Sequence, residues 1–232
     1  MPSTVLMMRC DRRADLELAQ ELHQRGHVVY ATALQVRTVG QLQAIGVRVD
    51  AVNLGDWDTV KEFMARLKSD NAMVDVVINN VDLGSLRVPL SADELRQQFD
   101  IDMVAAFAIL NLFGFTSGPL KRIVNIIRAP DWSSIGLGSP LNANRKLLVK
   151  LCQSQRETLG PFGVEVAALQ VSGAPAASGP GKKEQDANAE AVHAFQQRLA
   201  DAILAVGLPA LSTLGADAFL PAMLGIRPKL VA

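Results

Sequence analysis

The sequence predicts a doubly wound α/β domain, in which helices cover both faces of a mostly parallel sheet. Short apolar runs alternate with amphipathic segments of helical length along most of the 232 residues. Several of these runs are rich in β-branched residues, as is typical of strands buried on both faces. Gly26 and Gly46 each follow a helical segment, where a helix C-terminus favours glycine. Repeated strand–helix units favour right-handed crossovers, and we expect a single Rossmann-like domain over 1–232 with six or seven strands.

The individual elements follow from the period of the apolar residues. Continuous apolar runs predict strands, and recurrence every three or four residues predicts helices. The expected strands are 3–8, 28–33, 47–52, 74–79, 122–127 and 164–171. The expected helices are 15–24, 39–45, 57–68, 92–113, 142–159 and about 189–206. The Gly-, Pro- and Lys-rich stretch 172–189 predicts a mobile loop, and the apolar tail 207–232 is expected to pack on the domain.

Composition excludes several classes of partner. Lys plus Arg and Asp plus Glu are equal at 23 each, so the balance of charge does not favour nucleic acid. No stretch has the length of a membrane span, and the N-terminus becomes charged too soon for a secretory signal. Cys10 and Cys152 lie far apart and are expected to be buried free thiols in a reducing compartment. The three histidines, His23, His27 and His193, lack metal-ligand spacing, and we expect a cytoplasmic protein without a metal.

Five segments occur in an order and at a spacing that resemble the short-chain dehydrogenase/reductase (SDR) family. They are 74–80 (Val-Asp-Val-Val-Ile-Asn-Asn), 99–104, 122–127, 142–146 (Asn-Ala-Asn-Arg-Lys) and 160–166 (Gly-Pro-Phe-Gly-Val-Glu-Val). In that family these segments correspond to the Asn-Asn-Ala-Gly strand, the following helix, the strand before the catalytic serine, the Tyr-x-x-x-Lys helix and the turn behind it. The resemblance extends over essentially the whole chain and implies the fold predicted above.

The positions that the resemblance assigns to a cofactor are altered. The family's Gly-x-x-x-Gly-x-Gly loop, where bare backbone approaches a pyrophosphate, falls on 9–15 and contains no glycine. The simpler interpretation is a solvated loop that caps a helix, and we therefore expect no cofactor. The alternative is that guanidinium groups hold the phosphates of NAD(P) directly. The candidate binding residues are then Arg9, Arg12, Arg13, Asn53, Asn79 and Asn80.

The end of the second expected strand lacks the family's mark of nucleotide preference. Residues 31–34 read Ala-Thr-Ala-Leu. They offer neither a carboxylate for a ribose nor an arginine for a 2′-phosphate.

The tyrosine on which SDR chemistry depends is absent. The position four residues before Lys146 is Asn142, and the only tyrosine of the chain is Tyr30, in an expected strand. A carboxamide has no acidic proton to give to a carbonyl. Lys146 alone matches the motif, and its simpler interpretation is an exposed or salt-bridged helix residue.

The remaining catalytic positions are equally altered. Asp102 replaces the family's asparagine, and it is a candidate partner of Lys146. The serine position falls on Arg128 or Ala129, and Ser133 and Ser134 are candidates about one turn later. Similarity to halohydrin dehalogenases is excluded, because their Ser-Tyr-Arg set also needs a tyrosine.

Three hypotheses about function remain. The first is a pseudoenzyme of the SDR fold that binds a small ligand, or a partner subunit through the helices 92–113 and 142–159 as a homo-oligomer or heteromer. The second is an atypical NAD(P)-dependent oxidoreductase with an altered cofactor pose. The third is a regulator that senses a metabolite through the loop 172–189.

Overall fold

The computed structural model describes residues 2–82, 91–101, 120–129, 140–172, 194, 197–201, 203–204 and 211–215. In the first half of the chain the elements are β1 (Thr4–Met8), α1 (Arg13–Gln24), β2 (Val28–Ala33), α2 (Val36–Ala44), β3 (Arg48–Ala51) and α3 (Trp57–Ser69). In the second half they are β4 (Val76–Asp82), α4 (Ala92–Phe99), β5 (Arg122–Ala129), α6 (Pro140–Leu159), the 3₁₀ turn η2 (Gly160–Phe162), β6 (Glu165–Ser172) and β7 (Leu211–Gly215). Residues 197–201 are also helical.

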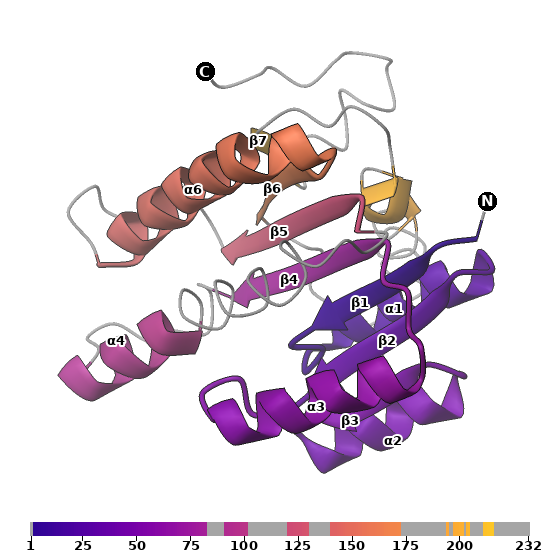
Figure 1. Cartoon of the computed structure of the whole chain (residues 1–232). Helices are drawn as coiled ribbons and strands as arrows, with labels where there is room; N and C mark the ends of the chain where they lie inside the picture. Colours follow the sequence, from indigo (N-terminus) through magenta and orange to yellow (C-terminus); the bar gives the residue numbers. More distant parts are fainter. Residues whose placement is uncertain are drawn as a thin grey trace, which may run out of the picture.

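The seven strands form one sheet in the order β3-β2-β1-β4-β5-β6-β7, and every neighbouring pair is parallel. Figure 1 shows α3 and α6 on the near side of this sheet, α1 and α2 behind it, and α4 beyond the carboxyl end of β4. The chain winds outward from β1 to β3, then returns to the other side of β1 to begin β4. The predicted doubly wound fold with six or seven strands is therefore confirmed.

Some predicted bounds shift. The helix predicted over 39–45 begins at Val36, one residue after an extended Gln35. The tail predicted over 207–232 contributes β7, which extends the sheet beside β6. Of the helix predicted over 92–113 the structure describes α4 and the two residues that follow it. The predicted loop 172–189 lies outside the described residues apart from Ser172.

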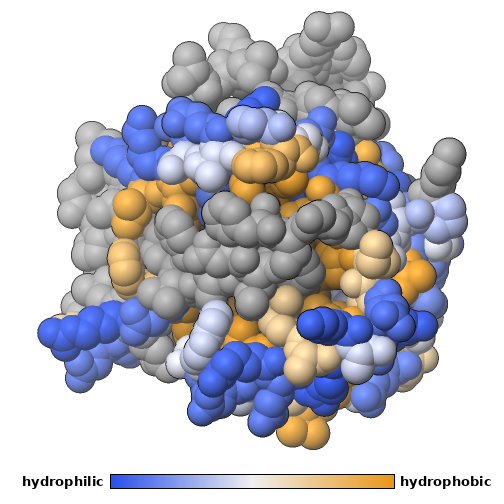
Figure 2. Space-filling view, viewed as in Figure 1, coloured by the Kyte–Doolittle hydropathy of each residue, from blue (hydrophilic) through white to orange (hydrophobic). Residues whose placement is uncertain are grey.

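Alternating side chains of the central strands enter two separate cores. Val5 and Met7 of β1 pack with α1 and α2 on one face of the sheet. Leu6 and Met8 pack on the other face with residues of α3 and α6. All four are at most 2% exposed, as expected for a central strand with both faces covered. In Figure 2 hydrophilic residues predominate on the outward sides of α3, α4 and α6, which fits this arrangement.

Arg122 joins two strands of the sheet by an ion pair and the C-terminal helical segment by a hydrogen bond. Arg122, 8% exposed, donates from Nε and Nη2 to Oε2 of Glu165 at 2.9 and 2.5 Å. Its Nη1 donates to the carbonyl of Ile203 at 2.8 Å. One guanidinium group thus ties β5 to β6 and to the segment that precedes β7.

Tyr30 is a strand residue, as predicted. The residue is 4% exposed, its hydroxyl accepts a hydrogen bond from Nη1 of Arg48, and the guanidinium carbon of Arg48 lies 5.2 Å from the ring centroid. Both cysteines are buried free thiols, and burial raises the pKa of Cys152 to about 12. Among the described residues, no helix combines the length and the apolar character that a bilayer span requires.

Candidate functional site

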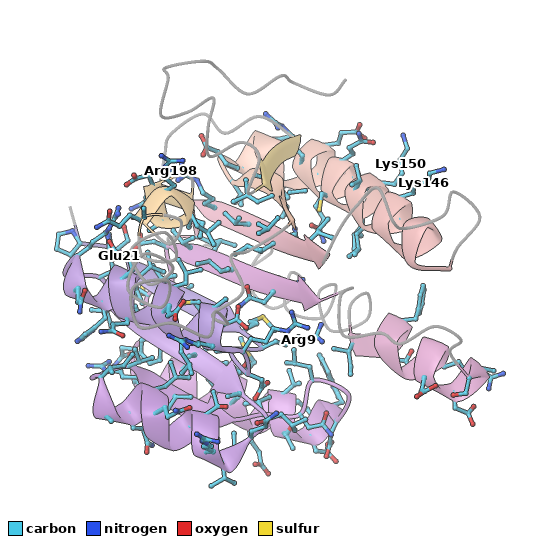
Figure 3. All side chains as sticks on the ribbon, turned by 180° about the vertical axis from the view of Figure 1, so that it is seen from behind. Arg9, Glu21, Lys146, Lys150 and Arg198 are labelled. Carbon is cyan, nitrogen blue, oxygen red and sulfur yellow. The ribbon has the colours of Figure 1, made fainter. Side chains whose placement is uncertain are left out.

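The candidate site lies where the winding of the sheet reverses, between the carboxyl ends of β1 and β4. In doubly wound folds a ligand binds in the crevice at this switch point, because the loops on either side of it turn apart. The loop 9–12 follows β1, and Asn79 and Asn80 lie near the end of β4. Figure 3 shows Arg9 beyond the carboxyl end of β1 and beside the tip of β4.

The first glycine position of the resemblance keeps a backbone suited to glycine. Arg9 has a φ of 59°, in the left-handed region that side chains with a Cβ rarely adopt. Its N–H donates to Oγ1 of Thr32 at 3.1 Å, and the N–H of Cys10 donates to the carbonyl of Thr32 at 2.8 Å. Two hydrogen bonds to β2 therefore fix the loop in this turn although the glycine has become arginine.

At the other two glycine positions, side chains alter the start of α1. Asp15 is 1% exposed, and its Oδ2 accepts from the N–H of Arg12 at 3.3 Å, so a carboxylate occupies the positive end of the helix. Arg13 extends along α1, where its Nε donates to Oε1 of Glu17 at 2.8 Å and its side chain is 72% exposed. The Asp15 side chain at the third glycine position thus caps the helix, whereas Arg13 at the second follows the helix surface.

A second carboxylate reaches across to the end of β2. Oδ1 of Asp11 accepts from the N–H groups of Leu34 and Gln35 at 2.8 and 2.9 Å. These two residues separate β2 from α2. No sequence pattern pairs Asp11 with this turn, because more than twenty residues separate them.

Asn53 shapes its own turn. Its Oδ1 accepts from the N–H of Gly55 at 3.0 Å, which is an Asx-type turn after β3.

A chain of buried amides runs from β4 to α6. Nδ2 of Asn79 donates to Oδ1 of Asn125 at 3.0 Å, and Nδ2 of Asn125 donates to Sγ of Cys152 at 3.2 Å. Nδ2 of Asn80 donates to the carbonyl of Met8 at 2.9 Å and so links β4 to β1. Oδ1 of Asn80 is buried and has no hydrogen-bond partner within the described part of the chain. It is the polar atom at the switch point that a ligand or water would satisfy.

Lys146 does not face this crevice. Buried Leu148, Cys152 and Leu159 define the side of α6 that packs on the sheet. Lys146 precedes Leu148 by two residues, a rotation of about 200° at 100° per residue. Its side chain is exposed, and Figure 3 shows it directed away from the sheet beside Lys150. Asn142 belongs to the first turn of α6, and only its backbone is described.

Three other sequence candidates cannot be compared with this geometry. Asp102, Ser133 and Ser134 lie outside the described residues. Their roles, and the pairing of Asp102 with Lys146, stay predictions.

A separate pocket of about 280 Å³ opens at the opposite, amino edge of the sheet. His23, His27 and Arg48 line it together with Gly26, Gly46 and the start of β2. Burial lowers the pKa of His27, and its Nδ1 accepts from the N–H of Ser3 at 3.0 Å. His27 is therefore half-buried, and its charged form is disfavoured. Among the described residues no cluster of His, Cys, Asp and Glu could hold a metal ion.

Comparison with known proteins supports the resemblance to SDRs. The chain matches no protein-family model. It is 25% identical over 160 residues to the NADPH-dependent 1-acyldihydroxyacetone phosphate reductase of Schizosaccharomyces pombe, in an alignment that covers 67% of this chain and 54% of the yeast protein. The chain thus spans about half the length of this curated relative.

Solved SDR structures share the fold over nearly the whole chain. A short-chain dehydrogenase from Streptomyces avermitilis has a TM-score of 0.69 at 17% identity and covers 96% of this chain and 92% of its own. The 3-ketoacyl-(acyl-carrier-protein) reductase from Brucella melitensis, complexed with NADH, has a TM-score of 0.71 at 14% identity, with 92% and 96% covered. A short-chain dehydrogenase from Leptospira borgpetersenii with bound NAD⁺ has a TM-score of 0.68 at 10% identity, with 93% and 91% covered.

These relatives overturn the expectation that no cofactor takes part. The curated relative is NADPH-dependent, and proteins of this fold hold NADH and NAD⁺. The expectation rested on the missing glycines, and it was wrong to equate their loss with loss of the crevice. Arg9 keeps the left-handed turn and Arg13 extends along α1, so part of the loop geometry survives the substitutions.

Proposed function

We propose that this chain is an atypical oxidoreductase of the SDR family, which binds a nicotinamide dinucleotide at the switch point between β1 and β4. The observation that carries the proposal is the guanidinium-bearing loop 9–13, held against β2 at the place where this fold binds phosphate. Support also comes from the curated reductase and from the nucleotide-bound structures of the same fold.

Arginine replaces bare backbone in the proposed grip on the pyrophosphate. The N-terminus of α1 is already capped by Asp15, so fewer backbone N–H groups remain to bind phosphate. Arg9 and Arg12 lie at the same turn and are half-buried. Guanidinium groups donate paired, charge-assisted hydrogen bonds to phosphate oxygens and offset the carboxylate. Asn80, with its unsatisfied Oδ1, would contact the bound nucleotide from β4.

The catalytic consequence is a slow reaction. Nicotinamide, when bound, supplies or accepts the hydride, and the protein contributes position and a proton. Asn142 replaces the catalytic tyrosine of the SDR motif, and Lys146 faces away from the crevice. Loss of a general acid lowers a rate by about 10²- to 10⁴-fold. We therefore propose weak reductase activity, with binding as the stronger property.

Titration with NADH and NADPH tests the binding step, with nucleotide fluorescence and thermal unfolding as readouts. We expect saturable binding of at least one nucleotide at micromolar concentration. Arg9→Ala and Arg12→Ala should each weaken it by about 10- to 100-fold, since a hydrogen bond to a charged group contributes about 1.5–3 kcal/mol. Arg66→Ala is the matched control, because Arg66 is an exposed arginine in the last turn of α3 that pairs with Asp50. Absence of binding by folded protein would contradict the proposal.

Turnover is tested separately with a panel of ketones that includes an acyl-dihydroxyacetone phosphate, the compound class in the curated relative's name. Oxidation of NAD(P)H above the rate without enzyme, and lost in Arg12→Ala, would support the oxidoreductase. Tight nucleotide binding without any turnover would instead favour the first hypothesis, a protein that works by binding.

The partner predicted for the long helices remains a proposal. Phe99 at the end of α4 and Leu147 on α6 are 42% and 44% exposed, so each presents apolar surface that a second subunit would cover. Sedimentation at micromolar concentration should show a dimer that Leu147→Glu dissociates. A monomeric wild-type protein would exclude self-association through these helices.

A further inference from the structure

Asp11 supplies a carboxylate at a place where the local sequence has none. Residues 31–34 contain no acidic or basic side chain. In the folded chain Oδ1 of Asp11 accepts from the N–H groups of Leu34 and Gln35 at 2.8 and 2.9 Å. Among the described residues, its Oδ2 has no hydrogen-bond partner. One oxygen thus fixes the turn between β2 and α2, and the other remains able to accept a hydrogen bond.

This turn is where the adenosine ribose of a dinucleotide lies in doubly wound folds. A carboxylate there accepts hydrogen bonds from ribose hydroxyls, whereas a 2′-phosphate needs a cation or unpaired N–H groups. The two N–H groups that precede α2 are both occupied by Asp11. The carboxylate therefore removes the natural phosphate donors of this helix start and adds a negative charge beside them.

A basic residue lies in the same region. Arg37 is in the first turn of α2 and its side chain is exposed. An exposed cation is screened by water and salt, whereas Asp11 is half-buried and fixed by two backbone donors. Arg9 and Arg12 of the same loop are assigned to the pyrophosphate in the proposed function, so Asp11 is the charge held at the turn that a 2′-phosphate would meet.

We propose that Asp11 makes the crevice selective for NAD(H) over NADP(H). The inference rests on the proposed function, since it assumes that a dinucleotide binds at the switch point. The choice between NAD(H) and NADP(H) is thus made by a residue of the loop after β1, because the end of β2 has neither the carboxylate nor the arginine that usually makes it. This chain should therefore differ in preference from its NADPH-dependent curated relative.

The test compares the affinities of NADH and NADPH, and of 5′-AMP and 2′,5′-ADP, which differ only in the 2′-phosphate. Wild-type protein should prefer the form without the 2′-phosphate by about 10- to 100-fold, from the repulsion of like charges a few ångströms apart. Asp11→Asn retains an oxygen that can accept from Leu34 and Gln35, and it should reduce the preference at least about tenfold by tightening NADPH. Asp11→Ser provides a second variant if the amide disturbs the turn.

Asp75→Asn is the matched control. Asp75 is a half-buried carboxylate at the amino edge of the sheet, where its Oδ2 accepts from the N–H of Thr4 at 2.9 Å. This variant removes a comparable charge and likewise retains an oxygen that can accept from the backbone, and the nucleotide preference should not change. Raising the salt concentration should reduce the preference of the wild-type protein for NADH over NADPH and leave the ratio of Asp11→Asn unchanged. A purely structural role of Asp11 would not give this difference.

The outcomes distinguish failure of the proposed function from failure of the role of Asp11. If folded wild-type protein binds none of these nucleotides, the proposed function fails and this inference with it. If it binds NADPH as tightly as NADH, or if Asp11→Asn leaves the ratio unchanged, the role of Asp11 is refuted while nucleotide binding stands. A preference for NADPH that Arg37→Ala abolishes would also refute it and would assign the selection to Arg37.

Discussion

The left-handed backbone of Arg9 predicts an unusual ranking of substitutions at this position. Arg9→Gly and Arg9→Ala both remove the guanidinium group and all its contacts. They differ only in the Cβ, which a φ of 59° disfavours. The comparison of the two variants therefore isolates the backbone, whatever the arginine side chain contributes in the wild-type protein.

The expected difference in stability follows from that φ. Alanine forced into the left-handed region loses about 1 kcal/mol relative to glycine. For a chain of this size, a change of 1 kcal/mol in the free energy of unfolding moves the Tm by about 2–4 °C. Arg9→Gly should accordingly unfold about 2–4 °C above Arg9→Ala, with the same order in urea denaturation.

Gln20 provides the control with the opposite sign. It is an exposed residue in the middle of α1, where alanine is favoured over glycine by about 1 kcal/mol. Gln20→Ala should therefore be more stable than Gln20→Gly. Equal stabilities of the two Arg9 variants, or a more stable Arg9→Ala, would refute the left-handed turn. The same two variants should lose nucleotide affinity equally, because the proposed contact is made by the guanidinium group.

Two further predictions concern the stability of the fold. Glu165→Gln should lower the free energy of unfolding, measured by urea titration, by about 1–2 kcal/mol. This value lies between those of exposed and buried ion pairs, because the Arg122 side chain is 9% and the Glu165 side chain 38% exposed. Lys121→Gln is the control: it breaks a surface pair with Asp75 and should cost less than about 1 kcal/mol in the same titration. His27 should make stability fall as pH drops through its unfolded pKa of about 6.5, since burial lowers its folded pKa and the unfolded chain then binds more protons. His27→Gln should flatten that part of the pH profile, and an unchanged profile would show that His27 does not titrate differently on folding.

The sequence by itself determined the architecture of the domain. The strands and helices were predicted from the periodicity of the apolar residues, from glycine at helix ends and from the order of the SDR-like segments. The structure shows them within a few residues of the predicted bounds. These features are local, because a strand buried on both faces or a helix with one apolar side is written in neighbouring residues. The substitutions in the loop 9–15 were equally visible, but their consequence was not.

Tertiary structure alone decided how the site is built. Asp11 meets residues 34 and 35 only because β1 and β2 pair in a fixed register, and the chain from Asn79 to Cys152 depends on β4, β5 and α6 meeting. The direction of Lys146 likewise depends on which side of α6 packs on the sheet. Contacts between residues far apart in the chain depend on strand register and helix rotation, and single-residue patterns carry neither.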